Sequence, residues 1–263
     1  MRLSSARWLM AILLLVSLGG CQAPSGMSGF RFPWSKGGSL GQRGTPLASV
    51  ETPPLTTEQK AEIQVAMARG LERQGRTDEA KKVYQEVLKV TPRQADAHHF
   101  LALLHDRKGE CEVAEGHYRN ALELVPDRAD VHCDLGYSYY LQERWPEAEN
   151  ELRQAVGLDP DLRRAHNNLG LLFARTGRDA EAMDAFARAG CSEAEAHANL
   201  ALAFSLAGRW ADARANFERA LQIDPQLQTA RDGLNSLQSL AAKQSGDGQP
   251  PVMVADTLAL QRE

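Results

Sequence analysis

Several features that define other protein classes are scarce in this sequence of 263 residues. Aromatic residues make up only 6% of the chain, which disfavours a turn-rich all-β fold. The four cysteines form no CxxC pair, which excludes a zinc ribbon and a thioredoxin-type motif. A net charge of -4 lacks the Lys/Arg excess that neutralises phosphates, so nucleic acid is not an expected partner.

Motifs for known chemistries are also missing from the sequence. It contains no P-loop, HExxH, GxSxG or Rossmann fingerprint, and no Cys/His pair in a context that would activate a nucleophile. We therefore expect a protein that is not an enzyme, with no cofactor, no metal and no small-molecule substrate. An enzyme that uses paired carboxylates is the remaining alternative, because such pairs have no sequence signature.

The N-terminus has the pattern of an export signal. Arg2 and Arg7 precede an apolar run from Trp8 to Leu18, which is too short to span a bilayer comfortably but suits a signal-peptide core. The run leads into Leu18, Gly19, Gly20 and Cys21, and this stretch resembles the bacterial lipobox. The resemblance implies that residues 1–20 are removed as a signal peptide and that Cys21 carries the lipid, including palmitate. An ordinary cleaved signal followed by a chance cysteine is the alternative.

Two further segments flank the central part of the chain. Residues 21–56 are rich in glycine and proline, which predicts a flexible linker behind the lipid anchor, and residues 244–263 are predicted to be a disordered tail. In lipoproteins of double-membrane bacteria, an aspartate after the cysteine retains the protein at the inner membrane. Gln22 stands there instead, which implies an outer-membrane anchor facing the periplasm. In a single-membrane source the same anchor would display the protein outside the cell.

The central part repeats itself. Pro92, Pro126 and Pro160 are 34 residues apart, and Pro225 follows 65 residues later, which indicates five repeats, one of them three residues short. With starts at residues 61, 95, 129, 163 and 194, the eighth position is always Ala or Gly, the twentieth is always Ala, and the twenty-fourth is large. The large residues are Tyr84, Tyr118, Leu152, Phe186 and Phe217. Small and large residues at such fixed offsets predict two closely packed helices in each repeat.

Turn signals lie between the two helices of each repeat. They are Gly75-Arg76, Gly109-Glu110, Glu143-Arg144, Gly177-Arg178 and Gly208-Arg209. Asp179 is expected to cap the next helix, and Pro146 to lie in a first turn. The pattern resembles the tetratricopeptide repeat (TPR) over residues 61–225. It implies an all-α solenoid of five helix pairs over residues 57–243, with a capping helix from about Gln226 to Lys243.

Histidine recurs at the fourth position of repeats two to five, as His98, His132, His166 and His197. These residues lie on different helix pairs, too far apart for one zinc ion, so we predict structural packing instead of a metal site. Cys111 and Cys133 are expected at opposite ends of neighbouring helices, where they cannot form a disulfide. We therefore expect Cys111, Cys133 and Cys191 to be free buried thiols.

The TPR resemblance also implies a binding surface, because the first helices of such arrays line a concave groove. Carried over by repeat position, the groove residues are His99, Leu103, Cys133, Tyr137, Tyr140, Asn167, Leu171, Arg175 and Leu202. The apolar members form a recognition strip, unless they pack between neighbouring helices instead. Asn167 and Arg164 match only part of the family's carboxylate clamp, which needs lysines. Internal or helical peptide segments are therefore the expected ligands.

The combination of lipobox and repeat array resembles pilus-assembly lipoproteins of the tight-adherence (Flp) and type IV pilotin kinds. The resemblance implies a protein-protein interaction module that binds secretin or pilus proteins. A periplasmic scaffold for peptidoglycan or other envelope-biogenesis enzymes is the alternative, because such scaffolds have the same architecture.

Overall fold

The computed structural model describes residues 54–246, with side chains up to Ser239. The predicted signal peptide, Cys21 with most of the linker, and the tail from residue 247 lie outside the described residues. Residues 54–246 contain eleven helices and no strand, so the all-α fold class is confirmed. The helices are α2 (Thr57–Arg73), α3 (Thr77–Val90), α4 (Ala95–Arg107), α5 (Cys111–Leu124), α6 (Ala129–Leu141), α7 (Trp145–Leu158), α8 (Arg163–Arg175), α9 (Asp179–Arg188), α10 (Glu193–Leu206), α11 (Trp210–Ile223) and α12 (Gln228–Gly246).

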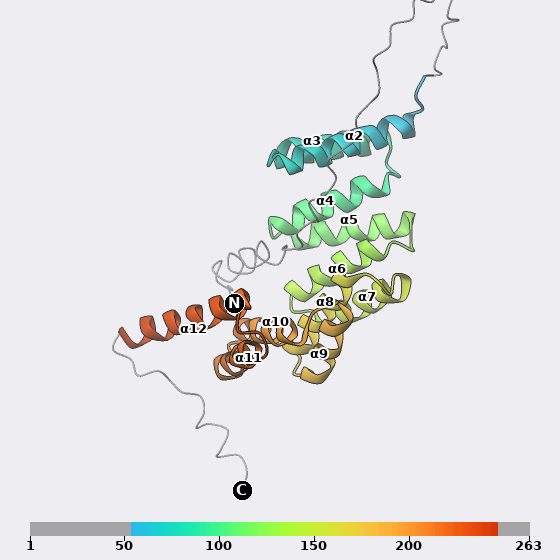
Figure 1. Ribbon diagram of the computed structural model, residues 1–263. Coiled ribbons are helices and arrows are strands. Elements are labelled where there is room, and N and C mark those ends of the chain that lie inside the picture. The colour runs from blue at the N-terminus through green and yellow to red at the C-terminus, as the bar shows by residue number, and fades with distance from the viewer. Residues whose placement is uncertain (1–53, 247–263) are drawn as a thin grey trace, which may run out of the picture. The chain divides into compact units, whose positions relative to one another are not determined.

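Consecutive helices form the predicted pairs, from α2 with α3 to α10 with α11 (Figure 1). The first helices also contact one another along the array, α4 with α6, α6 with α8, and α8 with α10. They therefore present one continuous face, which we call the first-helix face. The last helix, α12, packs on α10 and α11 as the predicted cap, and it ends at Gly246 instead of near Lys243.

The turns inside the repeats follow the predicted chemistry. Gly75, Gly109, Gly177 and Gly208 all have φ between 74° and 77°, the left-handed region that glycine enters without a steric penalty. Glu143 holds the same place in the third repeat with φ 60°. In every repeat the N–H of the following residue bonds the carbonyl five residues earlier, as Arg178 does with Phe173. This is the Schellman pattern, which satisfies carbonyls at the helix end.

An arginine after the turn links neighbouring repeats. Arg178 lies over the Phe173 ring, with its guanidinium carbon 4.2 Å from the centroid, and it pairs with Glu181 at 2.6 Å and with Glu149 of the previous repeat at 2.8 Å. The same stacking and pairing recur for Arg144 and Arg209. These arginines therefore connect consecutive repeats.

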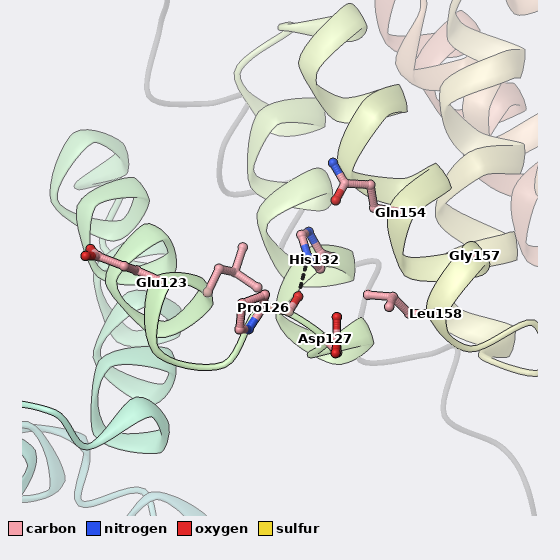
Figure 2. Close-up of a pocket in the computed structure, with 8 residues that line it drawn as sticks. Glu123, Pro126, Asp127, His132, Gln154, Gly157 and Leu158 are labelled. Carbon is pink, nitrogen blue, oxygen red and sulfur yellow. Dashed lines mark hydrogen bonds between the residues drawn. The ribbon is translucent and has the colours of Figure 1, made fainter.

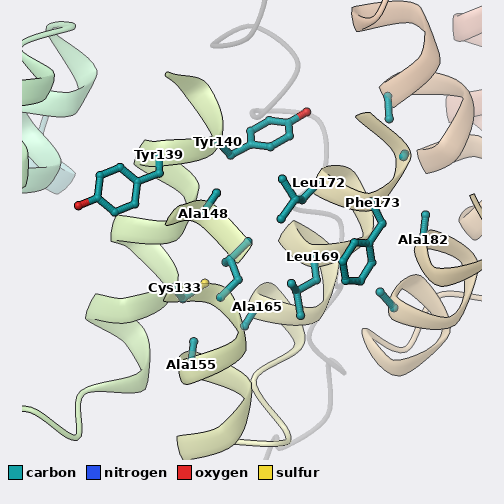
Figure 3. Close-up of a cluster of buried hydrophobic side chains, with 14 of the residues drawn as sticks. Cys133, Tyr139, Tyr140, Ala148, Ala155, Ala165, Leu169, Leu172, Phe173 and Ala182 are labelled. Carbon is teal, nitrogen blue, oxygen red and sulfur yellow. The ribbon is translucent and has the colours of Figure 1, made fainter. Parts of the chain in front are cut away.

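The small eighth position determines how closely the two helices of a repeat approach. A Cβ atom at Gly136 would lie 2.7 Å from Leu152, and one at Gly170 would lie 2.5 Å from Phe186. Both large side chains are fully buried, as the small-and-large pattern predicted. Figure 3 shows the surrounding core, in which Leu169, Leu172 and Phe173 of α8 lie between Tyr140 and Ala182.

The shortened fourth repeat ends its second helix early. α9 has 10 residues where α7 has 14, and Gly190 follows with φ 83°. The Arg163 side chain fills the space and donates to the carbonyl of Ala189 at 2.6 Å. The prediction that Asp179 caps this helix is wrong, because Asp179 is its first residue and Arg178 holds the N-cap position without a side-chain bond. Pro146 lies in the first turn of α7, as predicted.

Candidate functional site

Six of the nine predicted groove residues are half-buried on the first-helix face. Four of them occupy the ninth position of repeats two to five, and we call this set the position-nine stripe: Leu103, Tyr137, Leu171 and Leu202. Asn167 and Arg175 lie on α8 beside it. The stripe side chains pack against buried core residues with one side and keep the other side exposed. They are therefore both structural and accessible.

The other three predicted groove residues are inside the protein. His99, Cys133 and Tyr140 are 4%, 0% and 7% exposed, so the expectation that they offer binding surface is wrong. Their helix positions are correct, but side chains from other helices cover them. Asn168 of α8, for example, donates to the Cys133 sulfur at 3.5 Å. Burial raises the pKa of the Cys133 thiol to about 11, so it is protonated and unreactive at neutral pH.

A buried carboxylate, Asp134 on α6, is the reason why His99 is covered. One of its oxygens lies 2.8 Å from Nε2 of His99 on α4, and the other lies 2.7 Å from the Arg164 guanidinium on α8. A single side chain therefore joins three consecutive repeats.

Asp134 is not among the residues predicted from the sequence. Its one signal is its charge at the sixth position of a repeat, where the other four residues are uncharged. The five residues at that position are Ala66, Phe100, Asp134, Asn168 and Asn199.

Further charged residues surround His99 at the start of α6, where its Nδ1 lies 3.8 Å from the Asp130 carboxylate. Arg128 pairs with Asp96 of α4 at 2.8 Å and with Asp130 of α6 at 2.7 Å. The hydrogen bond from Arg128 lowers the pKa of the Asp130 carboxyl to about 2. Asp96 and Asp130 are thus already paired with a cation within the chain.

Aromatic side chains extend the stripe toward the turn of the third repeat. The rings of Tyr137 and Tyr140 stack with centroids 5.8 Å apart, and Tyr140 meets Trp145 edge to face at 5.5 Å. Arg175 lies over Trp145 at 5.5 Å and pairs with Glu143 at 3.3 Å. Half-buried Trp145 is a second residue that is absent from the predicted groove. Its signal in the sequence is a tryptophan at the seventeenth position, which recurs as Trp210 in the fifth repeat.

The first-helix face is hollowed between α2 and α4. This pocket has a volume of about 270 Å³ and is lined by Arg69, Glu72, Arg73, Phe100, Leu103 and Arg107. Arg69 lies over the Phe100 ring at 4.8 Å, and Arg107 pairs with Glu72 at 3.0 Å. Leu103 therefore connects the stripe with a pocket in which arginines outnumber acidic residues.

A larger hollow of about 580 Å³ lies elsewhere, between the ends of α5 and α7 (Figure 2). It is lined by Leu122, Glu123, Pro126, Asp127, His132, Gln154, Gly157 and Leu158, and none of these is a predicted groove residue. His132 is occupied there by bonds to the Pro126 carbonyl at 3.0 Å and to Glu151 at 2.6 Å. This hollow therefore offers no unoccupied imidazole for a ligand.

The sequence of the array matches a known protein family. Residues 37–251 match the model of the cilia and flagella-associated protein 70 C-terminal domain, a TPR family. The chain belongs to this TPR family. No curated protein sequence matches it.

Solved structures of TPR proteins share its fold. PilF of Pseudomonas aeruginosa is 22% identical, with a TM-score of 0.54 over 73% of this chain and 99% of that one. YrrB, described as a TPR protein with an unusual peptide-binding site, is 19% identical, with a TM-score of 0.51 over 69% and 98%. A thermophilic TPR protein of Thermus thermophilus is 23% identical, with a TM-score of 0.51 over 67% and 98%.

The recurring histidines of the TPR array are structural. Nε2 of His98, His132 and His166 bonds the carbonyl of the proline six residues earlier, at 3.1, 3.0 and 2.9 Å. His197 lacks that proline and bonds Asn216 at 2.9 Å. Among residues 54–246, no three His, Cys, Asp or Glu side chains are grouped to hold a metal ion. These hydrogen bonds hold each histidine within its own repeat.

The three cysteines of the described region are free thiols, and Cys133 is fully buried whereas Cys111 and Cys191 are half-buried. The expectation of burial is therefore correct for Cys133 alone. None of the helices within residues 54–246 has the length and apolar character needed to cross a membrane.

Two histidines of the second repeat, His98 and His117, are bonded to each other. The Pro92 carbonyl only accepts, so Nε2 of His98 carries the proton, and its Nδ1 accepts from Nδ1 of His117 at 3.0 Å. Burial, together with His98, His105 and Lys81, lowers the pKa of His117 to about 4. His105 is in turn bonded to Glu110.

We expect the contribution of His117 to the stability of the array to fall as the pH drops from about 6.5 to about 4. In this window the unfolded chain binds a proton at His117 that the folded chain does not bind. The free energy of unfolding therefore decreases as the pH falls. Because His117 is only half-buried, the expected loss is about 1–2 kcal/mol. Urea titrations at several pH values should show this loss in the wild type and a smaller one in His117→Gln. Equal pH profiles would contradict the assignment.

Proposed function

We propose that this chain is a lipid-anchored, non-catalytic TPR interaction module of the cell envelope that binds peptide segments through the first-helix face. The observation that carries the proposal is the position-nine stripe, which runs across four consecutive first helices with each side chain half-exposed. Apolar side chains rimmed by polar groups are typical of protein-binding surfaces. The lipobox-like stretch ending at Cys21 supports the anchor.

Internal or helical segments fit this face better than a chain terminus. Arg164, one of two candidates for a carboxylate clamp, is bound to Asp134 at 2.7 Å. Releasing it would leave the buried Asp134 carboxylate with one partner fewer, which costs stability. Asn167 alone lacks the charge to hold a terminal carboxylate. Apolar side chains of a peptide, spaced to meet successive repeats, are the better match to the stripe.

Pilus or secretin assembly at the outer membrane, facing the periplasm, is our leading assignment. The likeness to PilF supports it only at the level of the fold, since the identity is 22%. A scaffold for peptidoglycan or other envelope-biogenesis enzymes is the second candidate, supported by the same anchor and the same face.

We expect the double change Tyr137→Ala and Leu171→Ala to weaken partner binding at least about tenfold, because it removes the two central stripe side chains. Val90→Ala with Val113→Ala is the matched control, since these residues are exposed on second helices away from the stripe. The measurement is quantitative mass spectrometry of proteins crosslinked to each variant in envelopes of the source cells.

The identity of the lost partners separates the two candidates. Loss of secretin or pilus components in the stripe variant supports pilus assembly, whereas loss of peptidoglycan hydrolases or synthases supports the scaffold. If the stripe variant keeps every partner at the level of the control, the first-helix face is not the binding site.

A further inference from the structure

The repeat position that forms the stripe holds an arginine in the first repeat. The ninth residue there is Arg69 on α2, whereas repeats two to five have the apolar stripe residues at this position. Arg69 lies over the Phe100 ring of α4, with its guanidinium carbon 4.8 Å from the centroid. It lines the same pocket as Leu103, the first residue of the stripe. A ligand that covers the stripe and extends past Leu103 therefore meets a cation next.

Two of the three arginines in this pocket are free to bind an anion. Arg107 pairs with Glu72 at 3.0 Å, and the other Glu72 oxygen accepts from the Tyr84 hydroxyl at 2.7 Å. Both oxygens of the one carboxylate in the pocket are therefore occupied. None of the ion pairs within residues 54–246 involves Arg69 or Arg73, and both of these side chains are exposed. Three arginines against one glutamate leave the pocket with an excess of positive charge.

The surroundings of these arginines suit a carboxylate. Guanidinium groups bind carboxylates through paired hydrogen bonds, and the half-buried Phe100 and Leu103 provide an apolar wall that strengthens such bonds by keeping water away from one side. We propose that this pocket binds acidic side chains of a partner segment whose apolar side chains lie on the position-nine stripe. The inference rests on the proposed function and specifies its ligand as an apolar peptide that is acidic at one end.

Acidic side chains match this pocket better than a chain terminus does. A single terminal carboxylate would leave part of the excess positive charge without a partner, whereas two neighbouring acidic residues provide a carboxylate for Arg69 and another for Arg73. The pocket is also separate from Asn167 and Arg164, the partial match to the family's carboxylate clamp, because those residues lie on α8, three repeats away.

Peptide selection tests this assignment with the full-length protein in mild detergent and a phage library of random internal peptides. We expect the wild type to select apolar peptides enriched in Asp and Glu. Arg69→Gln with Arg73→Gln should lose that enrichment, and Arg69→Glu with Arg73→Glu should select Lys and Arg instead. The matched control is Arg214→Gln with Arg219→Gln, which removes the same charge from exposed positions on α11, a second helix. This control should select the same peptides as the wild type.

Titration of one selected peptide, synthesised with both ends blocked, gives the affinity. Replacing its acidic residues by Asn and Gln should weaken binding to the wild type at least about tenfold, and this difference should shrink at high salt. The same replacement should leave the affinity for Arg69→Gln with Arg73→Gln unchanged. A free C-terminal carboxylate should not tighten binding. Circular dichroism should confirm that every variant keeps its helices.

The results separate this inference from the proposed function. If no selected peptide depends on Tyr137 and Leu171, the proposed function fails and the inference fails with it. Peptides that depend on these two residues but show no enrichment in Asp and Glu would overturn the acidic-peptide assignment alone. Equal affinity of the acidic peptide for the wild type and for Arg69→Gln with Arg73→Gln would do the same. Tighter binding through a free C-terminus would overturn the choice of a side chain as the ligand.

Discussion

We expect Asp134→Ala to lower the free energy of unfolding by about 3 kcal/mol. The change leaves His99, which is 5% exposed at its side chain, without the carboxylate that bonds its Nε2, and it removes the partner of Arg164. Arg164 is half-exposed and can turn to water, which keeps the loss below that of a fully buried pair. Urea unfolding at neutral pH measures the effect.

Asp184→Ala is the matched control. Asp184 pairs with Arg188 one turn along α9, and both side chains are 63% exposed. Exposed pairs of this kind contribute less than about 0.5 kcal/mol. A similar loss of unfolding free energy in both variants would mean that the Asp134 contacts do not stabilise the packing of the repeats.

The fold follows from the sequence because its rules are local and periodic. Four of the five first helices are followed by a glycine, and in every repeat a small residue stands sixteen positions before a large one. Gly170 with Phe186 is such a pair, and the structure places them in contact. The cap at Asp179 was mispredicted because a cap depends on the dihedral angles of one residue, which periodicity does not determine.

The site was harder to predict because exposure depends on side chains about 35 residues away. His99 has the expected position on α4, and Asp134 of the next repeat then covers it. The net charge of the chain does not predict the charge of a local surface either. The chain has a net charge of -4, but the pocket beside Leu103 is lined by three arginines and one glutamate.

The apolar residues of α2 illustrate a further limit. Ile63 and Met67 occupy the third and seventh positions of their repeat, which are core positions in the other four repeats. Only the helices packed around a residue reveal whether it is covered, and residues 54–246 contain no helix before α2.

A second large effect on stability is expected where α8 and α9 pack closely together. We expect Gly170→Ala to lower the free energy of unfolding by about 2–3 kcal/mol, because the new Cβ would lie 2.5 Å from a fully buried Phe186 ring. Gly116→Ala is the matched control on α5, where a Cβ meets nothing within 4 Å. Better helix propensity should make this control more stable by about 0.5–1 kcal/mol.

Repeats one, two and five already tolerate an alanine at the eighth position opposite an aromatic ring, as Ala201 does with Phe217. The cost at Gly170 therefore measures how firmly the neighbouring repeats hold α8 and α9 at their closer spacing. Thermal or urea unfolding of the two glycine variants gives that cost directly. If Gly170→Ala were as stable as the wild type, the pair would be free to relax to the spacing of the alanine repeats, and the small eighth residue would not set the helix separation.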